Sequence, residues 1–293
     1  MIYMVNKWLI VNTLKGDDIV TRTFVGLRVD VNTICTGNNS VTARCYIGDN
    51  GDALLMKCYL MGDEYSKRLY GSMYYERELA IFSPSGDVEY IDVALSRWID
   101  GVALSECMAD SSRDFFDLSH NFDYLAYNLL TDKMVHCDIK PENIIVSDDG
   151  TMSLIDYDAL WSESLDMGDR HEYGTSGYRD VTTTEFTPPA FMRNYPLVLI
   201  SVILAALALD YSAMYKYVDQ DAMLDVSKKR SFSAAMKCAN DIFLRHADYA
   251  HLALLNCITP SGVNIDGLAD KMYKATYSRS PVVAEGLGPY FDV

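Results

Sequence analysis

The sequence predicts an α+β protein in which β-strands come first and helices follow. Residues 29–47 are expected to form two strands around a turn at residues 35–40, because strand-forming residues flank a turn-forming run. Residues 53–59 and 88–99 add further strands. Residues 115–130 are expected to form a helix, residues 197–209 a buried apolar helix, and residues 210–293 further helices. A chain of 293 residues can form one large domain or two small ones with a sizeable core.

The composition and the charge of the chain limit its possible binding partners and its cellular location. The chain has 25 Lys and Arg residues against 41 Asp and Glu residues, a net charge of −16, which disfavours binding to nucleic acid or to an anionic membrane surface. The seven cysteines lack Cys-x-x-Cys spacing, which argues against a zinc site and a disulfide framework and favours a reducing, cytoplasmic location. Residues 1–11 show no secretory signal. The apolar run 197–209 is shorter than the roughly 20 residues that span a bilayer, so no membrane span is expected.

The most informative stretch is residues 136–158, which read as a loop followed by a short β-hairpin. Two apolar strands flank an Asp-Asp-Gly turn, and the open ends of such a hairpin lie about 5 Å apart. Asn143 before the hairpin and Asp156 after it can therefore direct an amide oxygen and a carboxylate to one point. A nucleotide-bound Mg²⁺ needs only one or two such protein oxygens. The pattern predicts a magnesium site, with Asp138 and Lys140 placed to orient a hydroxyl against a phosphate.

This stretch resembles the catalytic and magnesium-binding loops of eukaryotic-type protein kinases. In that family an asparagine follows the catalytic-loop aspartate by five residues, as Asn143 follows Asp138, and Asp156 opens an Asp-Tyr-Asp segment similar to the family's Asp-Phe-Gly. The resemblance implies that Asp138 orients the substrate hydroxyl and that Lys140 contacts the transferring phosphoryl group. It also implies that Asn143 and Asp156 bind Mg²⁺, which Mn²⁺ could replace.

A second segment, residues 174–178, is similar to the family's Gly-Thr-x-x-Tyr segment. The resemblance implies that Thr175 in this segment positions Asp138 and Lys140. Taken along the chain, it also implies a two-lobed kinase-like fold. A β-rich N-lobe with one regulatory helix would span residues 1–96, a hinge residues 97–101, and a helical C-lobe residues 102–293.

The N-terminal part holds the positions that the resemblance assigns to ATP. Gly37 corresponds to the middle glycine of the loop that covers the phosphates, and Lys57 to the lysine that holds the α- and β-phosphates. Arg97 and Ile99 lie in the expected hinge, whose backbone would bind adenine. A helix is expected over residues 65–82, and Glu78 on it is the expected ion-pair partner of Lys57. Glu76 is the alternative partner.

The chain also departs from the family pattern. Cys137 stands where many kinases have an arginine that meets a phosphorylated activation segment, so activity independent of such phosphorylation is expected. Asp158 replaces the glycine of the magnesium motif, and both a metal role and a solvated turn acid remain open. The aspartate that kinases place near the start of the buried helix is missing, since Asn194 and Pro196 stand there. No Ala-Pro-Glu motif follows residue 178, and the candidate substitutes are Glu185 and the Pro188–Pro189 turn.

Together these residues predict an ATP- and Mg²⁺-dependent phosphotransferase similar to Ser/Thr protein kinases. Lys140, two residues after Asp138, favours a protein substrate. The alternatives are a nucleotide-binding pseudokinase that acts as a scaffold and a kinase for a small metabolite. The expected partners are ATP and a protein substrate.

Overall fold

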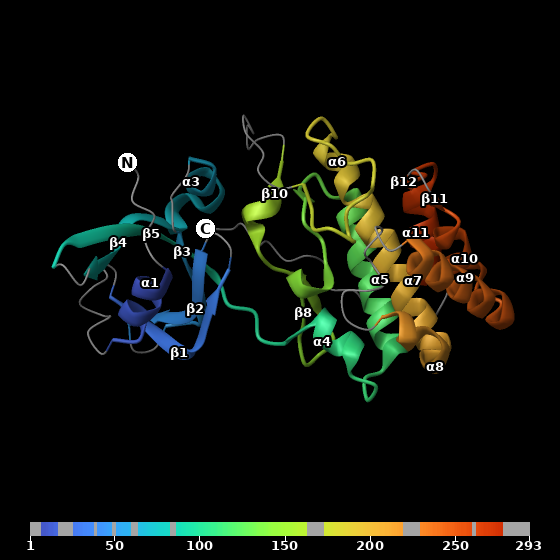
Figure 1. Cartoon of the computed structure of the whole chain (residues 1–293), viewed down its shortest axis with the longest axis horizontal. Coiled ribbons are helices and arrows are strands. Elements are labelled where there is room, and N and C mark those ends of the chain that lie inside the picture. The colour runs from blue at the N-terminus through green and yellow to red at the C-terminus, as the bar shows by residue number, and fades with distance from the viewer. Residues whose placement is uncertain are drawn as a thin grey trace. The chain divides into compact units, whose positions relative to one another are not determined.

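We describe a computed structural model of the chain, which covers residues 7–16, 26–37, 40–48, 51–59, 64–82, 86–162, 173–218, 229–259 and 262–277. The chain divides into two compact units, residues 1–99 and 100–293 (Figure 1). This division falls inside the segment predicted as a hinge. The first unit is built on a β-sheet and the second is mainly helical, so the predicted α+β class is confirmed.

The N-terminal unit contains a five-stranded antiparallel sheet with the strand order β1-β2-β3-β5-β4. Its elements are α1 (Lys7–Leu14), β1 (Leu27–Thr36), β2 (Ser40–Ile47), β3 (Leu54–Tyr59), α3 (Glu64–Tyr70), β4 (Tyr74–Phe82) and β5 (Val88–Arg97). Alternate side chains of the strands form the core on one face, together with Ile10 and Leu14 of α1. Met56 and Cys58 belong to this core, so Lys57 between them lies on the other face.

The helix predicted over residues 65–82 is wrong over most of its length. Only α3 is α-helical; a 3₁₀ turn, Gly71–Met73, follows it, and β4 occupies the rest. Glu78 therefore lies on a strand and not on a helix. β4 pairs with β5 and is interrupted between Tyr75 and Leu79, where it has more residues than the facing strand. Arg77, in this interruption, has a positive φ of 53°.

The C-terminal unit is mainly helical, with short strands near its beginning. Its helices are α4 (Leu104–Ala109), α5 (Phe115–Thr131), α6 (Pro189–Met192), α7 (Asn194–Leu209), α8 (Tyr211–Met214), α9 (Lys229–His246), α10 (Tyr249–Leu255) and α11 (Leu268–Tyr277). The strands are β6 (Val102–Ala103), β7 (Val135–His136), β8 (Ile144–Val146), β9 (Met152–Leu154), β10 (Leu160–Trp161), β11 (Ile258–Thr259) and β12 (Gly262–Val263). The two predicted helices correspond to α5 and α7, and the predicted hairpin to β8 and β9.

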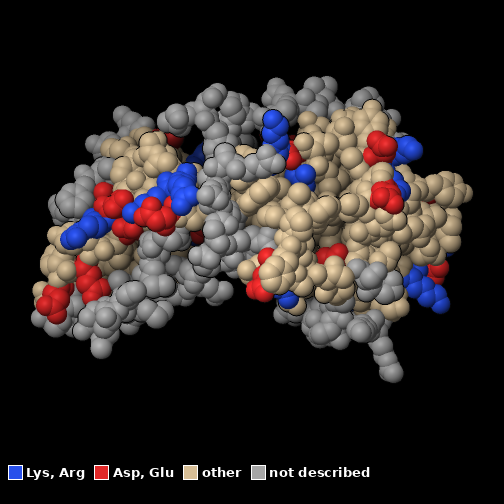
Figure 2. Space-filling view, turned by 90° about the horizontal axis from the view of Figure 1, so that it is seen from above, with Lys and Arg blue, Asp and Glu red and all other residues tan. Residues whose placement is uncertain are grey.

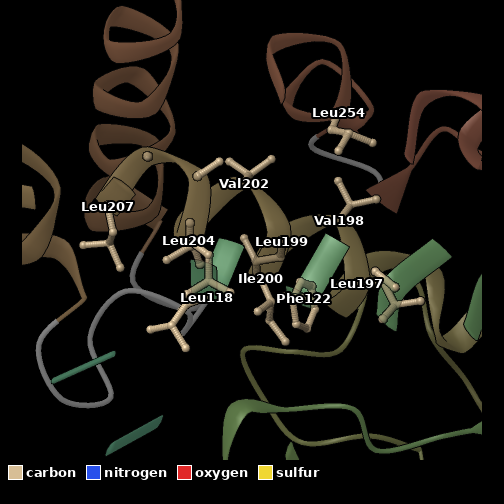
Figure 3. Packing of buried hydrophobic residues seen from close by; sticks show 14 of the residues in the cluster. Leu118, Phe122, Leu197, Val198, Leu199, Ile200, Val202, Leu204, Leu207 and Leu254 are labelled. Carbon is tan, nitrogen blue, oxygen red and sulfur yellow. The ribbon is translucent and has the colours of Figure 1, made fainter. Parts of the chain in front are cut away.

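Helix α7 is the centre of this unit and packs against α5, α9 and α10. Every residue from Asn194 to Leu207 is buried, as expected for a helix that is apolar on all sides. Figure 3 shows its side chains pointing toward Phe122 of α5 and also toward Leu254 of α10. By length and composition, residues 189–209 could cross a membrane. However, 83% of their most apolar window is buried inside the protein, which is typical of a core helix.

A buried charged network joins three helices of this core. The carboxylate of Asp123 on α5 accepts hydrogen bonds from Ser201 on α7 at 2.5 Å and from His251 Nε2 on α10 at 2.9 Å. The other ring nitrogen of His251 bonds Asp248 at 2.9 Å. Since both ring nitrogens face carboxylates, His251 is an imidazolium. Burial opposes this charge, but Asp123 and Asp248 raise the pKa of His251 to about 9.

One face of the described surface carries charged side chains of both signs (Figure 2). On the face shown in Figure 2, acidic and basic side chains of the N-terminal unit lie next to one another, and the C-terminal unit is mainly uncharged. Lys67, for example, forms ion pairs with Glu64 at 3.0 Å and with Glu76 at 2.9 Å. Glu76, the alternative partner for Lys57, is therefore an exposed acid paired with another lysine.

Candidate functional site

The loop from His136 to Asn143 is fixed at both of its ends. At its start, β7 pairs with β10, and the Cys137 amide donates to the Ala159 carbonyl at 2.7 Å. At its end, the 3₁₀ turn Pro141–Asn143 leads directly into β8. The loop and the segment after the hairpin are thereby held side by side, as the open ends of a hairpin require.

Both carboxylate oxygens of Asp138 accept hydrogen bonds, and the donors include Lys140 and Thr175, which also bond each other. Its Oδ1 accepts from the backbone amide and from the hydroxyl of Thr175, both at 2.7 Å. Its Oδ2 accepts from Lys140 Nζ at 2.7 Å and from Asn143 Nδ2 at 3.3 Å. Lys140 Nζ also donates to the Thr175 hydroxyl at 2.9 Å. The structure therefore brings together four of the predicted site residues, although Thr175 is 37 positions away from Asp138 in the sequence.

These contacts determine the protonation state of Asp138. Its burial would raise the pKa of the carboxyl group, but the hydrogen bonds from Lys140 and Thr175 outweigh this effect and hold the pKa below its usual range. Asp138 is consequently a carboxylate at neutral pH and a weak base. Such a group is suited to accept a hydrogen bond from a hydroxyl and to orient it.

His136 connects the loop to the far end of the hairpin. Its Nδ1 accepts a hydrogen bond from the Asp138 amide at 3.2 Å, so the proton of a neutral ring lies on Nε2, which donates to the Ile155 carbonyl at 3.0 Å. Burial lowers the pKa of His136, which keeps the ring neutral. The Ile155 amide also donates to the Asn143 carbonyl at 2.9 Å. Both backbone groups of Ile155 are thus bonded, immediately before Asp156.

Asn143 and Asp156 have the donor chemistry of a magnesium site. Asn143 uses its Nδ2 to bond the Asp138 carbonyl at 2.8 Å, and no described donor bonds its Oδ1. Asp156 supplies an exposed carboxylate at the other end of the hairpin. An amide oxygen and a carboxylate fit a hard cation that keeps phosphates and waters as its other ligands. No cluster of three or more His, Cys, Asp or Glu side chains that could hold a metal occurs within the described residues.

Asp156 has a left-handed backbone, with φ 63° and ψ 60°. This conformation is uncommon for a residue other than glycine, although aspartate tolerates it better than most. The chain changes direction here, from β9 into the 3₁₀ turn Tyr157–Ala159. Backbone strain of this kind often occurs at functional sites. Asp158 lies in the turn and is partly exposed, so both of its proposed roles stay open.

The segment that carries Thr175 packs against the loop through its backbone and through an apolar cluster. Gly174 has a φ of 82°, and a Cβ atom there would lie 3.2 Å from the Cys137 carbonyl oxygen, so glycine permits this close approach. Cys137 itself is buried with Val135, Ala159 and Met192, and Trp161 and Tyr173 pack around them. An apolar cluster therefore occupies the place where the resemblance would put a phosphate-binding arginine.

In the N-terminal unit, Lys57 and Glu78 are the buried charged residues among those described, with exposures of 7% and 3%. Lys57 pairs with Ala94 in the register of β3 and β5, and its Nζ lies 5.8 Å from the centre of the Tyr59 ring. Leu79 is in the core, so Glu78 beside it on β4 faces away from the core, as Lys57 does. A buried charge is costly without a partner. Lys57 and Glu78 have opposite charges and lie on strands that β5 separates, and the ion pair between them stays a prediction.

The remaining predicted positions are at element ends. Gly37 lies in the β1–β2 connection, and its amide donates to the Ser40 carbonyl at 2.9 Å, which makes the turn tight. Asn38 and Asn39 lie outside the described residues. Arg97 ends β5 and is exposed, and Ile99 follows it, partly buried, at the end of the unit.

Sequence reasoning missed two residues that hold the site's surroundings. Arg193 bonds backbone carbonyls at the end of α5. Asp180 accepts hydrogen bonds from the Thr182 amide at 2.8 Å and from the Val263 amide at 3.0 Å, and so connects the segment after Thr175 to the hairpin of β11 and β12. Gly262 makes room for this carboxylate, because a Cβ atom there would collide with it. An isolated arginine before an apolar helix and an aspartate in a loop give no signal of such roles.

Comparison with known proteins does not assign the chain to a family. No protein family model matches the chain, and no curated protein sequence matches it.

Proposed function

We propose that this protein transfers the γ-phosphoryl group of ATP to a Ser or Thr hydroxyl of a protein substrate, in a reaction that requires Mg²⁺. The observation that carries the proposal is the set of hydrogen bonds that fixes Asp138, Lys140, Thr175 and Asn143 around one carboxylate. Phosphoryl transfer depends mainly on positioning and electrostatics, and this set supplies both.

The roles follow from the chemistry of each group. Asp138 accepts the hydrogen bond of the acceptor hydroxyl and aims its oxygen at the γ-phosphorus. The new P–O bond forms as the bond to the β–γ bridging oxygen breaks, and the hydroxyl proton leaves through Asp138. Lys140 donates to the charged phosphoryl oxygens. Asn143 and Asp156 would hold Mg²⁺, which neutralises the phosphate charge when it is bound. Lys57 is the candidate contact of the N-terminal unit with the α- and β-phosphates.

A nucleotide-binding pseudokinase is the second candidate, and one observation favours it. Glu78 lies on β4 and not on the described helix α3, so the family's arrangement, in which a movable helix carries the lysine's partner, does not apply to Glu78. The cytoplasmic location stays part of the proposal. All seven cysteines are thiols and none forms a disulfide, as a reducing compartment would require.

Turnover of ATP with Mg²⁺ tests the proposal, using the full chain, a generic protein acceptor such as casein, and the Asp138→Asn and Asp156→Asn variants. We expect activity in the wild type and a fall of about 10²-fold or more in each variant, because each removes a positioned charge. Asp149→Asn is the matched control, since Asp149 caps the hairpin turn through the Thr151 amide. Nucleotide binding without turnover would support the pseudokinase. Transfer to small hydroxyl compounds but not to proteins would support the metabolite kinase.

A further inference from the structure

Arg193 lies between α6 and α7 and is bonded to the chain just before the candidate site. Its Nη1 donates to the carbonyl of Asp132 at 2.8 Å and to that of Met134 at 3.3 Å, and its Nη2 donates to the carbonyl of Leu130 at 2.9 Å. All three carbonyls belong to the last turn of α5 or to the link from α5 to β7. One planar group thus holds the segment that leads into the loop.

Two physical effects favour this arrangement. The last carbonyls of a helix have no partner within the helix, and a cation near them interacts favourably with the helix dipole. The guanidinium group has several donors in a rigid plane, so it can bond several carbonyls at once, which lysine cannot do as well. Arg193 is partly buried, so its charge is less solvated by water and its hydrogen bonds to the carbonyls are stronger.

Met192, the neighbour of Arg193, holds the next part of the same segment. Its side chain packs with Val135 and Cys137 in the apolar cluster described above. Met192 at the end of α6 and Arg193 just before α7 therefore contact the chain between residues 130 and 137, Arg193 through hydrogen bonds and Met192 through apolar packing. Asp138 follows immediately. The start of the buried helix, where the family has an aspartate, here supports the loop with an arginine.

We infer that Arg193 is a positioning residue, which fixes the loop carrying Asp138 to the buried helix α7 and so keeps the carboxylate aligned with its partners. The inference rests on the proposed function for its effect on rate. It does not rest on that function for its effect on the order of the loop. These two effects can be measured separately.

The experiment compares the Arg193→Met and Arg193→Lys variants of the full chain with two controls. Arg245→Met removes an arginine that bonds Asp210 at 3.0 Å in the same unit, and Leu254→Ala removes part of a buried side chain on α10 in the same core. For Arg193→Met we expect kcat to fall about 10- to 100-fold with little change in the KM for ATP, since misplacement of a reacting group by 1 Å can cost about 10²-fold. Arg193→Lys is expected to recover part of the rate.

Two further readouts separate positioning from mere stability. The acidic limb of the pH–rate profile is expected to move to higher pH in Arg193→Met, because a displaced Asp138 loses the hydrogen bonds that lower its pKa. Hydrogen exchange of the amides of residues 135–138 is expected to rise in Arg193→Met more than in Leu254→Ala. If Arg193→Met does not fold, Arg193→Lys alone carries the comparison, with a smaller effect in the same direction.

The outcomes are distinct. An unchanged kcat, acidic limb and exchange rate in a folded Arg193→Met would overturn the inference, and so would changes no larger than those of Leu254→Ala. If the wild type shows no transfer, the proposed function fails. Faster exchange in residues 135–138 would then still support the anchoring role of Arg193, and unchanged exchange would overturn it.

Discussion

Thr175 bonds the same carboxylate oxygen of Asp138 twice, through its backbone amide and through its hydroxyl, each at 2.7 Å. The amide bond is independent of the side chain, whereas the hydroxyl also accepts from Lys140 at 2.9 Å. The side chain of Thr175 is therefore the part that connects the two charged groups, and its contribution can be removed without removing the backbone contact.

We predict that Thr175→Val lowers kcat by about tenfold and shifts the acidic limb of the pH–rate profile upward. Loss of the hydroxyl removes one of the bonds that lower the pKa of Asp138 against the opposing effect of burial, so protonation sets in at higher pH. Thr175→Ser retains the hydroxyl and is expected to keep the wild-type profile. Equal profiles for the Val and Ser variants would show that the hydroxyl does not act on Asp138.

Because His251 is buried and charged, we predict that the free energy of unfolding of the protein decreases at alkaline pH. The pKa of His251 is raised from an ordinary 6.5 to about 9 in the folded protein, so its contribution is fully present below about pH 6.5 and is lost as the pH rises through 9. We expect His251→Asn to lose about 3–5 kcal/mol of unfolding free energy at pH 6, because Asp123 would be left buried without its cation. Urea unfolding at several pH values measures both effects.

The control for this prediction is His246→Asn, at an exposed position at the end of α9. This variant is expected to keep the alkaline loss of stability that the wild type shows. If His251→Asn retained the same loss between pH 6.5 and 9, the imidazolium would not be its source.

From the apolar cluster around Cys137 we predict that the protein is active without phosphorylation of this segment. We expect protein treated with a phosphatase to retain its full rate of transfer, because the segment near Thr175 is held by apolar packing in place of a phosphate–arginine pair. Cys137→Arg is expected to destabilise the C-terminal unit by several kcal/mol, since it buries a charge without a partner. Cys137→Ala is the matched small substitution. Activity that disappears with phosphatase and returns on rephosphorylation would contradict this prediction.

Gly101 is predicted to be essential for the start of the C-terminal unit. It has a φ of 151°, and a Cβ atom there would collide with the carbonyl oxygen of Val146 and lie 2.6 Å from Ile145 Cγ2. These atoms belong to β8, which pairs with β6 directly after Gly101, so they cannot move without breaking that pair. Gly101→Ala is expected to cost about 1–3 kcal/mol or more in thermal or urea unfolding. At Gly37, where a Cβ atom would have ordinary contacts of 3.6 Å, alanine is expected to cost much less.

Much of the fold could be predicted because local patterns and burial agree. Helix α5 begins after Asp114, whose carboxylate accepts from the Phe116 amide at 2.9 Å, and its apolar face is buried as its spacing indicates. The hairpin of β8 and β9 has its Asp-Asp-Gly turn, in which Gly150 has a φ of 85°. In both cases the signal lies within a few residues of the element that it predicts.

The prediction of a helix over residues 65–82 failed because an irregular strand can imitate helical spacing. Tyr75 and Leu79 both face the core, four residues apart, as they would on a helix. On β4 they are separated by an interruption in which Arg77 takes a positive φ and its amide donates to Asp92 at 2.8 Å. The strand alternation is broken at this point, and the sequence alone does not reveal the break.

The candidate site was predictable where it depends on spacing along the chain, as for Asp138 and Asn143. Contacts between distant segments were less predictable: Thr175 was expected only from the family resemblance, and the partners of Arg193 and Asp123 were not expected at all. Arg193 bonds carbonyls about 60 positions earlier, and the Asp123–His251 bond joins residues 128 positions apart. Such partners are selected by the packing of the helices, which a pattern in one segment does not encode.

The apolar surroundings of Cys137 bear on how such a protein could be controlled in a cell. A phosphotransferase whose active conformation is stabilised by its own internal contacts, with no phosphate group among them, becomes competent as soon as it folds. It would have no dormant form awaiting an upstream enzyme. Its output would then follow the rates of its synthesis and degradation and the supply of its acceptor.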